Sequence, residues 1–109
     1  QAVPALIKVF ETDEDMKVRG RAAEALCDIG GPEAVQGFVQ VLRAADQPMK
    51  VRKVAAHALG IIRATQAVPA LITVFQTHQE MKVRGWAAEA LGDIGGPQAI
   101  DGFIQVLTA

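Results

Sequence analysis

Apolar residues recur along this chain at steps of three and four residues. Two stripes show the pattern: Val18, Ala22, Ala25, Leu26 and Ile29 in one segment, and Val35, Phe38, Val39 and Leu42 in the next. Such steps place the apolar side chains on one side of a helix, whereas a half-buried strand would alternate. The pattern therefore predicts an all-α fold without strands.

Turn residues divide this pattern into seven helices. Gly30-Gly31-Pro32 and Gly95-Gly96-Pro97 each supply a glycine free to adopt positive φ after one helix and a proline suited to the first turn of the next. Pro4 and Pro69 also suit a first turn. The predicted helices span residues 1–11, 16–29, 33–44, 49–62, 66–76, 81–94 and 98–108.

Most of the chain is present twice. Residues 1–44 align without a gap on residues 66–109, and 32 of the 44 aligned pairs are identical. A shorter period lies within this one, because MKVRGRAAEAL (16–26), MKVRKVAAHAL (49–59) and MKVRGWAAEAL (81–91) follow one another at spacings of 33 and 32 residues. We call these MKVR-type helices A helices, and the QAV-type helices between them B helices.

The order of elements is B-A-B-A-B-A-B, which predicts a stacked array. We expect one domain over residues 1–109, an α-α superhelix (solenoid) of about three and a half two-helix repeats. Helix B at 1–11 is followed by repeats at 16–44, 49–76 and 81–108. Each helix pair has too little apolar surface to fold alone, so stability must come from stacking. Because the chain begins at Gln1 within the pattern, we expect a fragment of a longer array.

The A helix and the turn after it resemble a known repeat. The run V-R-x-x-A-A-x-A-L-G-x-I-G, seen from Val83 to Gly95 and followed by P-x-A-(V/I), is similar to the short HEAT-like repeat of the phycobilin-lyase class. The resemblance covers essentially the whole chain and implies that the A helices line a concave surface. That family usually has Asp-Pro where this chain has Asp15-Met16, Pro48-Met49 and Glu80-Met81, so the helix caps differ.

Composition excludes several classes of function. The net charge is −1, from 11 basic and 12 acidic residues, which is too balanced for a dedicated nucleic-acid or anionic-membrane binder. Cys27 is the single cysteine, so no disulfide forms within the chain and a reducing compartment is expected. No apolar stretch is long enough to span a bilayer. We expect a soluble, cytoplasmic protein.

Comparing the three A helices predicts the binding surface. Five positions differ among them at spacings that share one helix face, opposite the constant apolar stripe. The predicted partner-binding residues are Arg21, Glu24, Asp28, Lys53, Val54, His57, Ile61, Trp86, Glu89 and Asp93. Lys17, Lys50 and Lys82 would extend this face by one turn. The alternative is that these are solvated residues whose identity drifted.

Trp86 is the strongest single candidate on this face. It is the only tryptophan, and its counterparts are Arg21 and Val54, so packing alone does not require an indole there. Exposed Trp and Arg side chains are common anchors of protein interfaces. The alternative for Trp86 is contact with a neighbouring repeat.

Other polar residues indicate structure more than chemistry. Arg19, Arg52 and Arg84 are constant and lie beside the apolar stripe, which predicts a ladder bonded to helix-end carbonyls or carboxylates of adjacent repeats, with Asp28 and Asp93 as candidate acceptors. His57 and His78 have no His or Cys partner one turn away, so no metal site is expected. Cys27 replaces a glycine of the sister repeats and is interpreted as a packing substitution.

The sequence thus favours a non-enzymatic scaffold without a cofactor that binds a protein partner on the A-helix surface. The resemblance implies a second possibility, a bilin lyase or chaperone-like subunit with Trp86, His57, Glu24 and Glu89 as contacts. A third is a structural or self-assembly module. Helix 1–11 is expected to lack its A helix and to leave Val3, Leu6, Ile7 and Phe10 partly exposed, so a homo-oligomer through the end helices is also expected.

Overall fold

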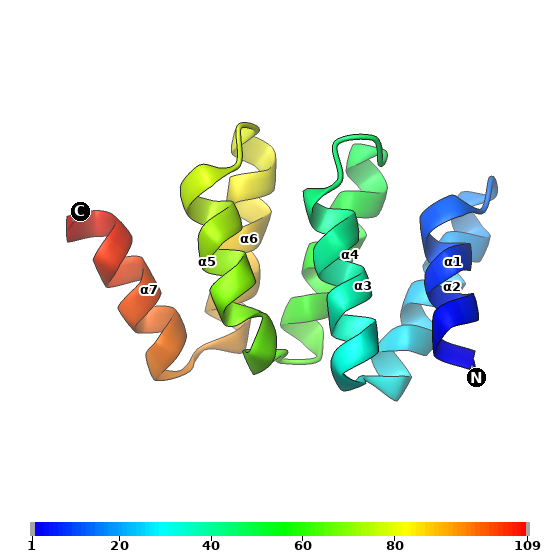
Figure 1. The fold of residues 1–109 in the computed structure, drawn as a ribbon, viewed down its shortest axis with the longest axis horizontal. Coiled ribbons are helices and arrows are strands. Elements are labelled where there is room, and N and C mark those ends of the chain that lie inside the picture. The colour runs from blue at the N-terminus through cyan, green and yellow to red at the C-terminus, as the bar shows by residue number, and fades with distance from the viewer. Residues whose placement is uncertain (1, 109) are drawn as a thin grey trace.

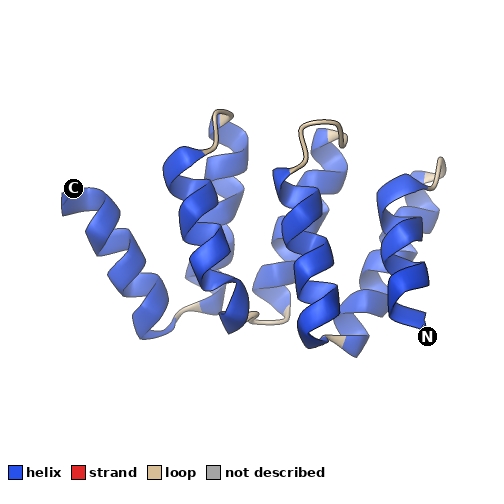
Figure 2. Cartoon of the chain, viewed as in Figure 1, coloured by secondary structure: helices blue, strands red, loops and turns tan. Residues whose placement is uncertain are grey.

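Seven α-helices and one short 3₁₀ turn follow one another in the computed structural model of the chain, which describes residues 2–108 (Figures 1 and 2). They are α1 (Ala2–Thr12), α2 (Met16–Ile29), α3 (Gly31–Arg43), α4 (Met49–Ile61), η1 (Thr65–Ala67), α5 (Val68–Thr77), α6 (Met81–Ile94) and α7 (Gly96–Thr108). No strand occurs among these residues. Gln1 and Ala109 of the expected array lie outside the described residues, as do the side chains of 98, 103 and 105–108. The all-α prediction is confirmed.

The helices form two layers along an elongated body of 42 × 25 × 16 Å. Figure 1 shows the B helices α1, α3, α5 and α7 side by side in one layer, with the A helices α2, α4 and α6 behind them. The chain ends lie at opposite ends of the row. Each A helix therefore has one side against the B layer and another side available to solvent.

Left-handed residues end the A helices. Gly30 and Gly95 have φ of 64° and 67°, and each donates its N–H to the carbonyl of the leucine four residues earlier. This conformation is nearly free of cost for glycine. In the middle repeat Arg63 stands at the corresponding position with φ of 51°, which is uncommon for a residue with a Cβ. There η1 leads into α5, instead of the direct Gly-Gly-Pro turn.

The closest hairpins join each B helix to the A helix that follows it. α1 packs on α2, α3 on α4, and α5 on α6, whereas α2 and α3 have few contacts with each other. Each closely packed hairpin is therefore a B helix followed by an A helix, whereas each expected repeat begins with the A helix. The expectation that helix 1–11 lacks an A helix is wrong for this reason, because α2 covers it. Phe10 is only 1% exposed, and Val3, Leu6 and Ile7 are partly buried against the core.

The core is built from small aliphatic side chains and one aromatic pair. Its fully buried members include Leu26, Leu59 and Leu91, which stand at equivalent positions of the three A helices. Between α1 and α3 the rings of Phe10 and Phe38 meet edge to face, with centroids 5.4 Å apart and planes at 75°. Apolar surface remains at both ends, where Ile29 is 50% and Ile100 is 56% exposed. Self-association through the ends stays a prediction.

The three constant arginines tie the A helices to the loops. Arg19 Nε donates to the carbonyl of Asp13, and Arg84 Nη1 donates to the carbonyl of His78 at 3.3 Å, at the equivalent place 65 residues later. Each of the first two arginines also reaches the next loop. Arg19 Nη1 donates to Gln47 Oε1 at 3.1 Å.

Arg52 has the most complete set of contacts in this ladder and is 2% exposed. Its Nη1 lies 3.0 Å from Glu80 Oε1, and its Nε donates to the carbonyl of Leu42 at 3.4 Å. The predicted ladder of arginines is therefore present. Its acceptors are loop groups and, for Arg52, the helix-end carbonyl of Leu42 and the Glu80 carboxylate. The expectation that Asp28 and Asp93 receive these bonds is wrong, because both lie at the opposite ends of their helices.

The A helices are not evenly spaced. α4 and α6 pack more extensively than any other pair of described helices, and α2 and α4 pack much less. Gly60 explains the close approach, because a Cβ built there would lie 2.9 Å from Asp93 Oδ2 and 3.0 Å from Asp93 Cβ. The equivalent residue of α2 is Cys27, whose side chain takes up the space that Gly60 leaves to its neighbour.

We expect Arg52→Ala to lower the free energy of unfolding by about 3 kcal/mol, since it leaves a desolvated carbonyl and breaks a partly buried ion pair. Arg84→Ala is the matched control. It removes one loop bond and no ion pair, and should cost about 1 kcal/mol. Urea unfolding followed by circular dichroism measures both, and equal costs would contradict the proposed ladder.

Two equivalent glycines test the spacing of the A helices. Gly92→Ala meets nothing within 4 Å and should raise the free energy of unfolding by up to about 1 kcal/mol through helix propensity. Gly60→Ala gains the same propensity but must push α6 away from α4, so it should be neutral or destabilising. Thermal and urea unfolding of the two variants compare them directly. Similar stabilisation by both would show that Gly60 does not set the spacing.

Candidate functional site

The ten predicted binding residues lie on α2, α4 and α6, and nine of them are exposed. These nine are Arg21, Glu24, Asp28, Lys53, Val54, His57, Ile61, Glu89 and Asp93. Exposure of the apolar members is high for their type, with Ile61 at 70% and Val54 at 37%. The A-helix layer therefore presents a mixed polar and apolar surface on its free side.

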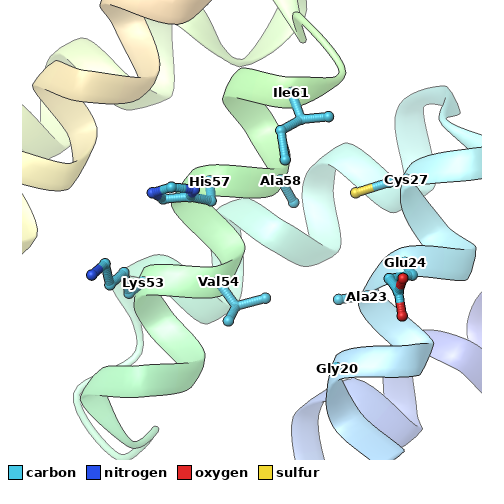
Figure 3. A pocket seen from close by; sticks show the side chains of 9 residues that line it. All are labelled: Gly20, Ala23, Glu24, Cys27, Lys53, Val54, His57, Ala58 and Ile61. Atoms are coloured by element: carbon cyan, nitrogen blue, oxygen red, sulfur yellow. The ribbon is translucent and has the colours of Figure 1, made fainter. Parts of the chain in front are cut away.

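Trp86 differs from the other nine. It is partly buried and packs against the core, so the indole is less exposed than expected for an anchor. Its role in partner binding stays a prediction. On α6 it occupies the position that Val54 occupies on α4. Val54 is directed toward α2 in Figure 3, and we infer from repeat equivalence that Trp86 is directed toward α4.

A groove opens along the corresponding seam between α2 and α4 (Figure 3). Its volume is about 270 Å³. Ala23 and Ala58 form the floor, and both are buried. Gly20, Glu24 and Cys27 of α2 line one side, and Lys53, Val54, His57 and Ile61 of α4 line the other.

The side chains divide into two groups in Figure 3. Val54 and Ile61 point from α4 into the groove, and Cys27 points toward them from α2. Lys53 and His57 extend to the other side of α4, away from α2. The interior of the groove is therefore apolar, and the charged groups lie at its margins.

The groove continues toward the loops that precede the A helices. A second hollow of about 190 Å³ adjoins the first and shares Gly20 and Val54 with it. Phe10 and Val51 contribute apolar surface there, and Lys17 and Lys50 contribute two cations. The expectation that Lys17 and Lys50 extend the variable face agrees with their place beside this hollow.

One carboxylate, Glu24 of α2, lines the groove. Asp28 stands one turn further along α2 and is not part of the lining; both side chains are exposed, and neither has an ion pair or side-chain hydrogen bond within the described residues. The counterpart of Glu24 on α6 is Glu89, whose Oε1 lies 3.6 Å from His57 Nε2. Because His57 faces Glu89, it does not neutralise Glu24. The ion pair itself is exposed on both sides and contributes little stability.

Cys27 is half-buried in the groove wall, and its environment raises the pKa of its thiol. Burial is the largest cause, and the charges of Asp28 and Glu24 add to it. All three favour the neutral thiol over the thiolate. Cys27 therefore acts as an apolar lining residue and not as an activated nucleophile. Its substitution for glycine, visible in the sequence, is the signal that could have located the groove.

Other polar clusters in the described residues do not form a competing site. No group of three His, Cys, Asp or Glu side chains is placed to hold a metal ion within that part of the chain. His78 contacts Arg52 and accepts from the N–H of Glu80, so it belongs to the loop network. None of the described helices combines the length and apolar character needed to cross a bilayer.

A larger hollow of about 490 Å³ lies on the B layer between α3 and α5. Its lining includes the polar side chains Gln36, Gln40, Arg43 and Gln66, together with Val35 and Val39. Such a surface is well solvated and offers less apolar area for its size than the α2–α4 groove. Sequence comparison of the A helices had no means of finding it.

Comparison with known families agrees with this architecture. The model of HEAT repeats matches residues 37–109, which is more than half of the chain, and the model of the PBS lyase HEAT-like repeat matches residues 18–44. A comparison with individual curated proteins gives no match. The duplicated helix pairs, the two-layer stack and both family models lead to one assignment: this chain belongs to the HEAT-repeat family, with repeats of the PBS lyase HEAT-like class.

Proposed function

We propose that this chain is a non-enzymatic scaffold that binds a segment of a partner protein along the α2–α4 groove. HEAT repeats generally mediate protein–protein interactions. The observation that carries the proposal is the groove itself, an apolar channel between α2 and α4 with cations at one end and the Glu24 carboxylate on its margin. Buried apolar anchors with a polar rim are the usual anatomy of protein interfaces.

The size of the groove favours side chains over a large cofactor. Sites for small molecules and cofactors commonly have about 300–1,000 Å³ and enclose most of the ligand. The apolar part of the groove has about 270 Å³ and is open to solvent. It accommodates one or two side chains of a bound segment, and a linear tetrapyrrole would stand largely outside it. The bilin-handling alternative therefore has less support than peptide binding.

Two equivalent glycines give a matched test. Neither Gly20 nor Gly85 has a neighbour within 4 Å of a built Cβ, so a large side chain fits at both positions, but only Gly20 lines the groove. Peptides selected from a displayed random library on the wild-type chain should bind Gly20→Phe at least about tenfold more weakly, and Gly85→Phe unchanged. Titration by fluorescence anisotropy measures both affinities.

Two results would overturn the proposal. Equal affinity of the selected peptides for both variants would place binding elsewhere, with the hollow between α3 and α5 as the first place to examine. The bilin-handling alternative would be favoured by two results together. Biliverdin would quench Trp86 fluorescence stoichiometrically, and no selected peptide would lose affinity in Gly20→Phe. Circular dichroism of both variants checks that the helices are retained.

Cys27 provides an independent reporter of occupancy. The thiolate is the reactive form, so a raised pKa should make alkylation of Cys27 by iodoacetamide slower near neutral pH than that of N-acetylcysteine. The rate should keep rising with pH beyond the point where the free thiol levels off. Glu24→Gln with Asp28→Asn should lower the pKa and raise the rate. A selected peptide should slow alkylation several-fold, and an unchanged rate at saturation would contradict docking over Cys27.

A further inference from the structure

The two seams of the A layer are equivalent by sequence and differ in how they are filled. Across α4 and α6 the seam contains Gly60, and Trp86, which stands on α6 at the position of Val54 on α4, is partly buried against the core. Across α2 and α4 the corresponding positions hold Cys27 and Val54, and the seam is an open groove. At equivalent positions of the two seams, the chain thus has the large side chain of Trp86 on α6 and the smaller Val54 on α4.

We propose that the α2–α4 groove is a pocket for an aromatic side chain of the partner, presented next to a cationic group. This inference rests on the proposed function and specifies its partner. Trp86 shows that the repeat accepts an indole at this place between two A helices. Val54 is shorter than tryptophan by the whole ring, and the groove extends over the space that the ring would take.

The dimensions and lining of the groove suit one aromatic ring. An apolar cavity of about 150 Å³ is enough to bind benzene. The first hollow has about 270 Å³, and its floor and walls are methyl groups and the Cys27 thiol. An indole or phenyl ring would meet apolar atoms on both helices, with its edge open to the solvent side.

Charge determines the second feature of the partner. Glu24 borders the groove without a partner in the described structure, while Lys53 and His57 are directed away from it. The neighbouring Cys27 thiol is neutral and offers no compensation. An ammonium or guanidinium group next to the aromatic ring would therefore face the Glu24 carboxylate. A cation at an exposed pair of this kind improves affinity by about two- to fivefold.

Three small probes separate the ring from the charge. Tryptamine has an indole and an ammonium group, indole-3-acetate has the same ring and a carboxylate, and butylamine has only the ammonium group. In methyl NMR spectra, tryptamine should shift Ala23, Val54, Ala58 and Ile61. Indole-3-acetate should bind the same place about two- to fivefold more weakly at low salt, and butylamine should leave these signals unchanged. Glu24→Gln should remove the preference between the two indoles.

Grafting the native indole tests the location. Val54→Trp should fill the groove, raise the midpoint of thermal unfolding and abolish the tryptamine shifts. Arg21→Trp is the matched control, because it adds an indole at the same repeat position on α2, where no A helix precedes it. It also removes a cation, so it should not weaken binding of tryptamine. Gly20→Phe, which fills the groove from the other helix, should block tryptamine independently of how Val54→Trp folds.

The proposal is overturned if tryptamine shifts persist in both Val54→Trp and Gly20→Phe, or if butylamine shifts the groove methyls as strongly as tryptamine. Its failure can be told apart from failure of the proposed function. Selected peptides that lack aromatic residues yet are excluded by Gly20→Phe would refute the aromatic pocket and retain the peptide-binding groove. If tryptamine binds in the groove but no selected peptide is excluded by Gly20→Phe, the aromatic pocket is supported and the peptide-binding groove is refuted.

Discussion

The distance between neighbouring A helices is the constraint on which the rest of this structure depends. The A helices meet through alanine and glycine, so a single side chain at the contact changes the separation. At Gly60 the absence of a Cβ lets Asp93 approach, and the seam between α4 and α6 is narrow. At the equivalent position of α2, the CH2–SH side chain of Cys27 occupies the space that is empty beside Gly60. The groove is therefore the consequence of a substitution and not of a missing element.

The arginine ladder makes such a substitution tolerable. Arg52 buries its guanidinium under the loop before α6 and bonds Glu80 there, while Arg19 reaches Gln47 in the loop before α4. These bonds join successive repeats at the loop end of the A helices, away from the positions of Cys27 and Gly60. Because a desolvated guanidinium is costly without its partners, the loops are held in register even where the helices separate.

The sequence predicted the helices well because the local signals agree with one another. Periodicity, the Gly-Gly-Pro turns and the internal duplication all placed the same boundaries, and α2 and α6 begin and end where they were expected. The exposed face of the A helices followed from comparing repeats. The pairing of each B helix with the A helix after it could not be read in this way, because a B-A-B-A order is equally compatible with either hairpin.

The groove itself depends on sub-ångström packing, which periodicity does not contain. In the sequence, Cys27 and Gly60 are two small residues at equivalent helix positions. The structure distinguishes their effects on helix spacing, because a Cβ built at Gly60 would come too close to Asp93. Trp86 illustrates a related point. Variation among the repeats predicts a residue that faces solvent, yet Trp86 varies and is partly buried against the core. Variation among repeats therefore marks both binding positions and the positions that decide which seam is open for binding.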